Sequence, residues 1–346
     1  MKAAVFDQYQ APLNIQQVPD PVPHSDSAII QVAACGICRS DWHGWMGHDA
    51  DVQPPHVPGH ELSGTIAAVG RQVEGWSPDQ RITVPFTCGC GNCRECRSGN
   101  HQICDSYTQP GVTHWGAFAE YVEVRHADVN LVGLPNTVDF VTAASLGCRF
   151  ATAFRAIMDQ GSVKCSETVA VHGCGGVGLS AVMIAAAAGA RVIAVDIAEQ
   201  PLALARECGA DELINAGEVD TVEAIRQLTS GGVAVSSDAL GSRTTCFNSV
   251  RCLRKRGRHV QIGLTLGADT DPPIPMGDVI AGELRVIGSH GMSVADYPRM
   301  IEMIERGTLN PGLLVNRLVT LEEGAVLLPK MDEFPCRGVS VIDMTA

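Results

Sequence analysis

Short runs of apolar or alternating residues, separated by glycine, proline and aspartate, occupy the first 149 positions of the chain. Runs of this length and period are typical of β-strands, whose successive side chains point to opposite faces. The pattern predicts strands at residues 2–6, 28–32, 62–69, 81–85 and 119–124. We therefore expect a β-rich unit over residues 1–149.

Beyond residue 150 the pattern changes to apolar strands that alternate with helical segments. Strand-like runs lie at 167–172, 191–196, 233–240 and 259–263, and helix-like runs lie between them at 179–188, 201–208 and 246–253. Such alternation builds βαβ units and a parallel sheet. The expected fold class is therefore α/β, with a parallel-sheet domain at 150–288 and a final segment, 289–346, that returns to the first unit.

The length and charge of the chain narrow its function. Its 346 residues exceed one ordinary core, which agrees with two domains. The net charge of -13 argues against nucleic acid and anionic membranes as partners. No apolar run reaches the ~20 residues that span a bilayer, and the N-terminal residues lack the apolar core of a signal peptide. We therefore expect a cytoplasmic protein, whose 14 cysteines are metal ligands or free thiols rather than disulfides.

Four of these cysteines are clustered in one short segment. They follow the spacing Cys90-x2-Cys93-x2-Cys96-x7-Cys104, with polar and turn residues in the gaps. Four thiolates in such a segment can surround one ion tetrahedrally, and sulfur ligands favour zinc. Because protein side chains would fill every position, the predicted site is structural rather than catalytic. The alternatives are four unrelated thiols or an iron–sulfur site.

A second set of metal-ligand residues is dispersed along the chain. Cys38, His60 and Cys148 each lie beside glycine or a turn, where a side chain can project into a cleft. Three protein ligands plus one open position form the usual catalytic zinc site. Asp41 is a candidate to orient His60 through the other ring nitrogen. The alternative is that these are ordinary core residues, since isolated cysteines and histidines usually are.

A glycine-rich turn follows the strand at 167–172 and opens the helix after it. The spacing G-x-G-x-x-G allows a tight turn and close approach of a pyrophosphate to the helix N-terminus. Asp196 ends the next strand, where an acid binds ribose hydroxyls, and Ile197 and Ala198 after it carry no positive charge. These features predict a dinucleotide site with NAD favoured over NADP, a bland turn being the alternative. The loop residues are Gly173, Gly175, Gly176, Val177 and Gly178.

These motifs together carry a family resemblance. Cys-Arg-Ser-Asp-x-His from Cys38, Gly-His-Glu around His60 and the four-cysteine segment occur here in the order seen in one family. In this the chain resembles the zinc-containing alcohol dehydrogenases of the medium-chain dehydrogenase/reductase superfamily, over essentially its whole length. The resemblance implies a GroES-like catalytic domain, a Rossmann doubly wound cofactor domain, NAD and two Zn²⁺ per chain.

The resemblance also implies which residues ligate the catalytic zinc. The second cysteine of Cys-Gly-Ile-Cys is the ligand in the family, so Cys38 matches and Cys35 does not. His60 and Cys148 match the other two ligands. Relatives acting on polyols often carry a carboxylate in place of the last cysteine, so Cys148 indicates the alcohol branch. Glu61 matches a neighbour that approaches the metal in some relatives, and its alternative role is a structural acid beside the site.

By the same resemblance, an alcohol would bind zinc and lose its proton through Ser40, the cofactor ribose and His43. The alternatives are a turn hydroxyl for Ser40 and a surface histidine for His43. Arg39 and Arg337 match positions that contact the cofactor pyrophosphate, Arg337 only through a loose Arg-Gly-Val-Ser match.

The substrate cleft and the assembly are also implied by the resemblance. Trp45 and Phe86 match positions that line the cleft, and Trp115 approaches the same space in a loose match; ordinary core packing is the alternative for each ring. An apolar slot of this kind favours small alcohols and aldehydes over polyols. Rival readings are a polyol, amino-alcohol or formaldehyde dehydrogenase, or a zinc-free binding or structural relative. The shorter chain length favours a homotetramer over a dimer.

Overall fold

The computed structural model describes residues 1–333 and 338–345, which fold into two compact units. The first consists of Met1–Ala151, Gly291–Arg306 and Val315–Ala346, and the second of Thr152–His290 and Gly307–Leu314. The boundaries at 151 and 290 lie two residues from those that the sequence pattern predicts. The pattern does not predict that 307–314 belongs to the second unit; the turn at Pro311–Leu314 packs there against a helix, α6 (Gly176–Ala187).

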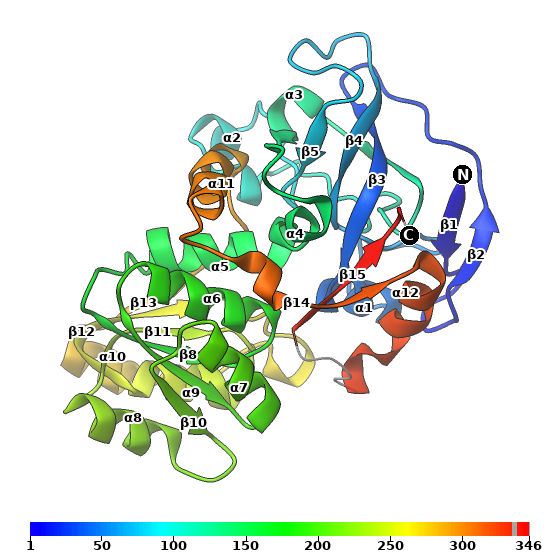
Figure 1. The fold of residues 1–346 in the computed structure, drawn as a ribbon. Helices are drawn as coiled ribbons and strands as arrows, with labels where there is room; N and C mark the ends of the chain where they lie inside the picture. The colour runs from blue at the N-terminus through cyan, green and yellow to red at the C-terminus, as the bar shows by residue number, and fades with distance from the viewer. Residues whose placement is uncertain (334–337, 346) are drawn as a thin grey trace. The chain divides into compact units, whose positions relative to one another are not determined.

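The first unit is built on a seven-stranded sheet, with a separate two-stranded antiparallel ribbon (Figure 1). The sheet order is β14-β15-β3-β4-β5-β7, and β6 pairs with β3. Within it Gly36 of β3 lies directly opposite Glu61 of β4 in an antiparallel register. The strands of this unit are β1 (Lys2–Val5), β2 (Asn14–Gln17), β3 (Ala28–Ile37), β4 (Glu61–Val69), β5 (Arg81–Thr83), β6 (Tyr121–Val124), β7 (Val132–Gly133), β14 (Val315–Val319) and β15 (Val339–Asp343).

Short helices and turns surround this sheet. The helices are α1 (Arg39–Met46), α2 (Arg94–Arg97), α3 (Ala127–Asn130), α4 (Phe140–Ala144), α11 (Tyr297–Glu305) and α12 (Leu321–Leu327). α1 begins where the Asp41 carboxylate accepts from the Cys38 amide at 3.1 Å, and it ends at Gly47, whose φ of 83° is the left-handed conformation that stops a helix. α1 therefore starts at the residue that the sequence predicts to bind metal.

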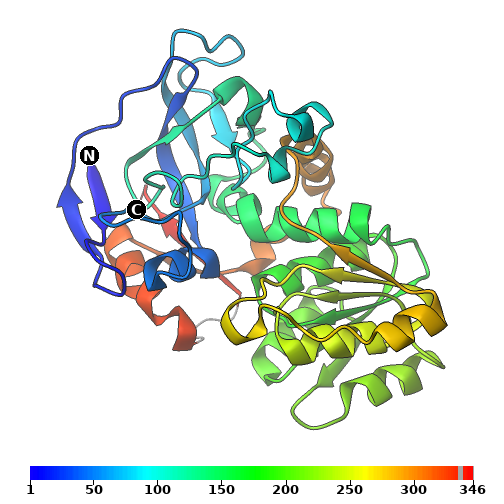
Figure 2. The same cartoon turned by 180° about the vertical axis from the view of Figure 1, so that it is seen from behind.

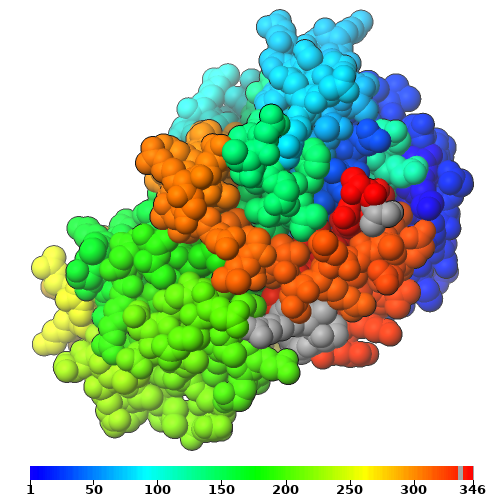
Figure 3. All heavy atoms as spheres, in the orientation of Figure 1, coloured from blue at the N-terminus to red at the C-terminus, as the bar shows by residue number. Residues whose placement is uncertain are grey.

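The returning segment is anchored in the first unit by α11. The Tyr297 hydroxyl donates to the Gly147 carbonyl at 3.1 Å, and the Thr137 hydroxyl donates to Glu305 at 2.7 Å. On the molecular surface α11, in orange, lies beside the green segment that precedes and includes α4 (Figure 3). These contacts hold residues 291–306 in the first unit.

The second unit is a doubly wound parallel sheet, which confirms the predicted Rossmann class. All of its neighbouring strands pair in parallel, in the order β10-β9-β8-β11-β12-β13. The order reverses between β8 and β11, the topological switch point at which such sheets bind ligands. The strands are β8 (Thr168–His172), β9 (Arg191–Asp196), β10 (Glu212–Asn215), β11 (Val233–Asp238), β12 (Leu253–Gln261) and β13 (Arg285–Gly288).

Helices cover both faces of this parallel sheet. α6 and α7 pack together on one face, and α8 and α9 on the other, as the two opposite views show (Figures 1 and 2). β8 is buried on both sides, which explains its uninterrupted apolar run. The remaining helices are α5 (Ala151–Arg155), which crosses the boundary between the units, α7 (Glu199–Glu207), α8 (Thr221–Thr229), α9 (Arg243–Arg251) and α10 (Met276–Gly282). No described helix is long and apolar enough to cross a membrane.

Candidate functional site

The four-cysteine segment folds into a compact lobe around the short helix α2. The sulfurs of Cys90, Cys93, Cys96 and Cys104 all lie within 4.8 Å of one another. The sulfurs of Cys93 and Cys104 are 3.7 Å apart and share a hydrogen bond. None of the four cysteines is in a disulfide. A group of thiols at this separation fits one tetrahedral zinc ion.

Backbone amides prepare this lobe for a cation. The Cys96 amide donates to the Cys93 sulfur, and the Ser106 amide donates to the Cys104 sulfur, at 3.3–3.4 Å. The first of these bonds is the main reason why the pKa of Cys93 is lowered to about 6. A thiol with this pKa is largely thiolate at neutral pH, the form that binds metal. Cys88, which the spacing excludes, is instead buried, and burial raises its pKa to about 12.

The dispersed residues come together in a second, buried cluster. Cys38 lies at the start of α1, His60 directly precedes β4, and Cys148 lies in the π-helical turn Leu146–Phe150. Their ligand atoms, with a carboxylate oxygen of Glu61, lie within 4.8 Å of one another. Cys35 lies outside this group, and its thiol contacts the Gly36 carbonyl instead.

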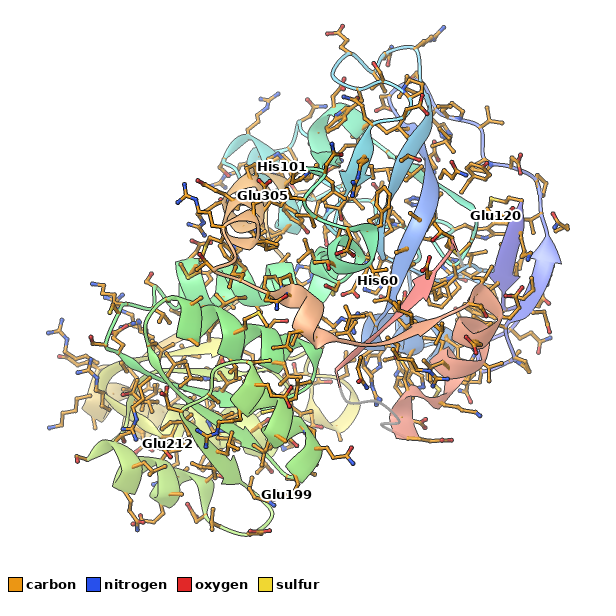
Figure 4. The ribbon with its side chains drawn as sticks, viewed as in Figure 1. His60, His101, Glu120, Glu199, Glu212 and Glu305 are labelled. Carbon is orange, nitrogen blue, oxygen red and sulfur yellow. The ribbon has the colours of Figure 1, made fainter. Side chains whose placement is uncertain are left out.

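A metal ion fits this cluster because one nitrogen in it lacks a partner. His60, labelled in Figure 4, is fully buried, and its Nε2 has no hydrogen-bond partner among the described residues. Burying an unpaired ring nitrogen is costly, and ligation of a cation removes the cost. The other ring nitrogen, Nδ1, lies 2.7 Å from an Asp41 oxygen. This is the contact that the predicted orienting role of Asp41 requires, and the same oxygen also accepts from the Gly59 amide at 2.9 Å.

The two cysteines of the buried cluster interact strongly. The pKa of Cys38 is held well below its usual value, first because the Cys148 thiol donates a hydrogen bond to it and then because Arg149 and His60 are nearby. The same bond and burial raise the pKa of Cys148. The protein groups alone therefore favour one thiolate, and a bound divalent cation would stabilise the second.

Glu61 is paired with Arg149 in this cluster. The Arg149 backbone amide and Nε donate to one Glu61 oxygen at 3.1 and 3.0 Å, and the guanidinium donates to the other oxygen. Burial raises the pKa of Glu61, and the arginine opposes this rise. Both side chains are almost completely removed from solvent.

Ser40 and His43 lie on α1 beyond the first ligand. Ser40 Oγ is 3.9 Å from the Cys38 sulfur, which places its hydroxyl beside the cluster. His43 Nδ1 lies 3.0 Å from Nδ1 of the exposed His48. The pKa of His43 is lowered to about 4 by burial and by the neighbouring charges of Arg39 and His48. His43 is therefore a neutral base at physiological pH.

The three predicted pocket rings differ in their surroundings. Phe86 lies edge-on to His60, with ring centroids 6.2 Å apart. Trp45 packs in the core of the first unit and donates its indole N–H to the Ala11 carbonyl at 2.6 Å. Trp115 is partly buried and donates to the Pro55 carbonyl at 3.1 Å. Of the three, Phe86 is the one with a direct contact to a predicted zinc ligand, and the pocket roles stay predictions.

The glycine turn of the second unit has the geometry that its spacing predicts. Gly173 adopts a φ of 90°, and a Cβ on Gly178 would lie 1.7 Å from the Gly173 carbonyl oxygen. A side chain on Gly178 would push α6 away from the turn, and a side chain on Gly173 would strain its left-handed backbone and approach Leu240. A Cβ on Gly175 would instead meet nothing within 4 Å, so the turn is open there. Asp196 closes the turn by accepting from the Cys174 amide at 2.7 Å.

The comparisons with known proteins agree with this arrangement. Residues 24–136 match the family model of the alcohol dehydrogenase GroES-like domain, and 176–306 match that of the zinc-binding dehydrogenases. An NAD-dependent alcohol dehydrogenase from Sulfurisphaera tokodaii is 33% identical over 99% of each chain. The chain belongs to the zinc-containing alcohol dehydrogenases. Its first unit is thus the GroES-like part, as the sequence motifs imply.

Solved structures of this family show the same fold. Alcohol dehydrogenase TADH from Thermus sp. ATN1 superposes with a TM-score of 0.91 at 27% identity, with 99% of each chain covered. A Sinorhizobium meliloti 1021 protein, solved with NADP bound, has a TM-score of 0.89 at 28% identity over 99% of this chain and 98% of its own. Because a structure of this similarity holds NADP, the choice between NAD and NADP rests on this chain's own residues.

Sequence reasoning missed three residues of this alcohol dehydrogenase site. Arg149 pairs with Glu61, His48 contacts His43, and Gly36 lies opposite Glu61 in the sheet. The sequence did contain a signal for the first of these contacts. Arg149 directly follows the predicted ligand Cys148, and a buried arginine needs a buried carboxylate as its partner. Of the predicted cofactor arginines, Arg39 donates to the Met331 carbonyl at 2.6 Å and lies over the Trp42 ring, while Arg337 lies outside the described residues.

Proposed function

We propose that this alcohol dehydrogenase oxidises primary or aromatic alcohols to aldehydes, or secondary alcohols to ketones, reversibly and with NAD. The observation that carries the proposal is the group of metal-ligand atoms from Cys38, His60 and Cys148. Within it, His60 Nε2 is buried and has no hydrogen-bond partner in the described part of the chain. Three protein donors leave one position of a tetrahedral ion for substrate. When bound, zinc supplies a Lewis acid that lowers the pKa of a hydroxyl, and the nicotinamide supplies the hydride acceptor.

Two zinc ions per chain are proposed, one in each cluster. Elemental analysis of carefully prepared protein, combined with NAD reduction by simple alcohols, tests this directly. Two zinc ions and alcohol-dependent NADH formation are expected. One or no zinc, or no turnover of any alcohol at full zinc occupancy, would overturn the proposal and favour the zinc-free binding relative.

Protein side chains provide the path by which the substrate proton leaves. Ser40, whose hydroxyl lies beside Cys38, would accept a hydrogen bond from the alcohol, and His43 on the same helix would act as the base that receives the proton. Because the pKa of His43 is lowered to about 4, His43 passes the proton on. His48, with its Nδ1 at 3.0 Å, is the next acceptor and is exposed to solvent.

The preference for NAD is proposed to come from Asp196. Its two oxygens already accept from the amides of Cys174, Ile197 and Ala198. This fixes a negative charge at the end of β9, where it can accept from ribose hydroxyls and repels a 2′-phosphate. Arg39 and Arg337 are proposed to contact the pyrophosphate, which would lie at the N-terminus of α6.

Removal of this charge should erode the preference for NAD. Asp196→Asn, which keeps an acceptor for the backbone, should lower the NAD/NADP ratio of kcat/KM about tenfold, and Asp196→Ala should lower it further. Glu199→Gln is the matched control, since Glu199 contacts Asn215 at 2.9 Å and should leave the ratio unchanged. A wild-type enzyme that uses NADP as well as NAD would contradict the assignment.

The substrate class is proposed from the three aromatic rings that the family resemblance assigns to the substrate pocket, of which Phe86 contacts His60. An apolar slot lined by Phe86, Trp45 and Trp115 leaves extra hydroxyls without partners, at about 1–3 kcal/mol each. The kcat/KM values of ethanol, hexanol and benzyl alcohol should therefore exceed those of 2,3-butanediol and sorbitol. Trp45→Ala should flatten this order. Trp76→Ala, which removes a partly buried ring packed against the same core as Trp45, is the control and should not. A wild-type preference for sorbitol would instead indicate a polyol dehydrogenase.

The assembly and the compartment are also proposals. Two clusters of thiolate ligands require reduced cysteines, which supports a cytoplasmic location. Association with another copy is supported by β13, which is an edge strand among the described residues and carries the exposed Val286. The homotetramer itself is proposed from the chain length, which matches the shorter chains of the family. Measurement of the molecular mass in solution distinguishes a tetramer from a dimer.

A further inference from the structure

Glu61 lies where it could close the metal site. One of its carboxylate oxygens lies within 4.8 Å of the ligand atoms of Cys38, His60 and Cys148. Its side chain is completely buried, so it has no water to satisfy its charge. The carboxylate therefore needs a cation, and the cluster offers two: Arg149, or an ion bound by the other three residues.

Arg149 engages both oxygens of this carboxylate. Its Nε and backbone amide donate to Oε1 at 3.0 and 3.1 Å, and its terminal nitrogen donates to Oε2. A planar two-point pair of this kind fixes both the position and the plane of the carboxylate. Arg149 directly follows the ligand Cys148. The same turn therefore positions a metal ligand, Cys148, and the residue that pairs with Glu61.

The sheet leaves room for this pair only because residue 36 is a glycine. Gly36 of β3 lies opposite Glu61 of β4. A Cβ on Gly36 would lie 2.3 Å from Glu61 Oε2 and 3.0 Å from a terminal nitrogen of Arg149. An alanine at this position would therefore displace the carboxylate from the arginine.

We propose that Arg149 is a positioning residue that holds Glu61 off the catalytic metal and so keeps the fourth coordination position open for substrate. The proposal rests on the proposed function of the Cys38, His60 and Cys148 cluster. Without Arg149, Glu61 would be a buried, unpaired carboxylate within 4.8 Å of the ligand atoms of Cys38, His60 and Cys148. It would then bind the catalytic metal, because no other charged partner compensates it.

Cobalt substitution tests this proposal through the metal itself. In the Co²⁺ enzyme, Arg149→Met should change the visible d–d spectrum, because a carboxylate oxygen enters the coordination sphere. Imidazole, as a probe of the open position, should bind ~10-fold more weakly if Glu61 occupies that position nine-tenths of the time. Transfer of the metal to a chelator should also become slower. Arg149→Lys should restore part of the wild-type behaviour.

Two further variants separate carboxylate binding from the loss of a positive charge or of packing. Arg149→Met/Glu61→Gln lacks the arginine but also the competing carboxylate, and it should regain the wild-type spectrum and imidazole affinity. Gly36→Ala leaves both charges and displaces Glu61, so it should shift both readouts in the direction of Arg149→Met. This variant decides the question if Arg149→Met does not fold.

The outcomes also separate this proposal from the proposed function. A spectrum and an imidazole affinity that are unchanged in Arg149→Met and in Gly36→Ala would overturn the role of Arg149, in an enzyme that still binds metal and oxidises alcohols. A change in Arg149→Met that persists in the double variant would also overturn it. A wild-type chain that binds no metal at Cys38, His60 and Cys148 would overturn the proposed function instead.

Discussion

The two cysteine-rich clusters of the first unit are built in opposite ways. The lobe takes its four sulfurs from one segment, 90–104, and its own backbone amides hydrogen-bond to them. The buried cluster takes its ligands from the N-cap of α1, from the residue before β4 and from the turn that contains Cys148, far along the chain. A site made of one segment can organise that segment, whereas a dispersed site depends on a fold that already exists.

The second difference lies in what surrounds the ligands. Around the lobe, polar residues and solvent complete the environment, and Cys90 and Cys93 are only partly buried. Around the buried cluster, the neighbouring groups are buried charges. Asp41 contacts His60, and the Glu61–Arg149 pair lies beside Cys148. The lobe is therefore suited to a structural zinc that stabilises the fold. The buried cluster is suited to a catalytic zinc whose reactivity the surrounding charges control.

The strongest test of this difference between the clusters is to remove a ligand of the buried cluster. Cys38→Ser or His60→Ala should lower kcat/KM by ~10³-fold or more, because Lewis-acid stabilisation is worth several kcal/mol. The far-ultraviolet circular dichroism spectrum and the zinc of the lobe should be retained. Cys35→Ser is the matched control, because this thiol is buried, lies three residues earlier and is outside the group of metal-ligand atoms. Near-normal turnover by Cys38→Ser would place the chemistry elsewhere.

Removal of a lobe ligand should give the reverse result. Cys93→Ser should lose one zinc and lower the free energy of unfolding by on the order of several kcal/mol, because structural zinc contributes folding energy. Protein that stays folded at low temperature should keep much of its turnover. The control is Cys88→Ser, which changes a buried thiol outside the cluster and should keep both zinc ions. An equal loss of turnover and stability in Cys93→Ser would remove the distinction between the clusters.

The smallest expected effect concerns the pH dependence of turnover. His43 accepts protons only when it is neutral, and its pKa of about 4 lies below the usual 6.5, so its acid limb should begin well below pH 6. His48→Gln removes one cause of that lowering and should move the acid limb to higher pH. His43→Gln should slow turnover ~10-fold, with partial rescue by small buffer bases. A pH profile that is identical in His48→Gln and the wild type would exclude His48 from the proton path.

The sequence pattern predicted most of the long elements and few of the short ones. β9 occurs at exactly its predicted residues, 191–196, and β8, β4 and α6 are displaced by at most a few positions. β3 runs to Ile37, five residues beyond its predicted end, because pairing with β4 and β15 carries it through Cys35 and Gly36. Among the strands of two to four residues, the pattern predicts β1, β5 and β6 but not β2, β7, β10 and β13, because periodicity is an uneven signal in runs of this length.

The order of amino acids alone was enough for the lobe and for the glycine turn. Their residues are close in sequence, so spacing and backbone freedom already limit what they can surround or approach. Folding decided the rest: the pairing of Glu61 with Arg149, the space that Gly36 leaves for it, and the contact between His43 and His48. Such contacts depend on strand register and helix position, which arise from the packing of distant segments and not from the spacing within any one of them.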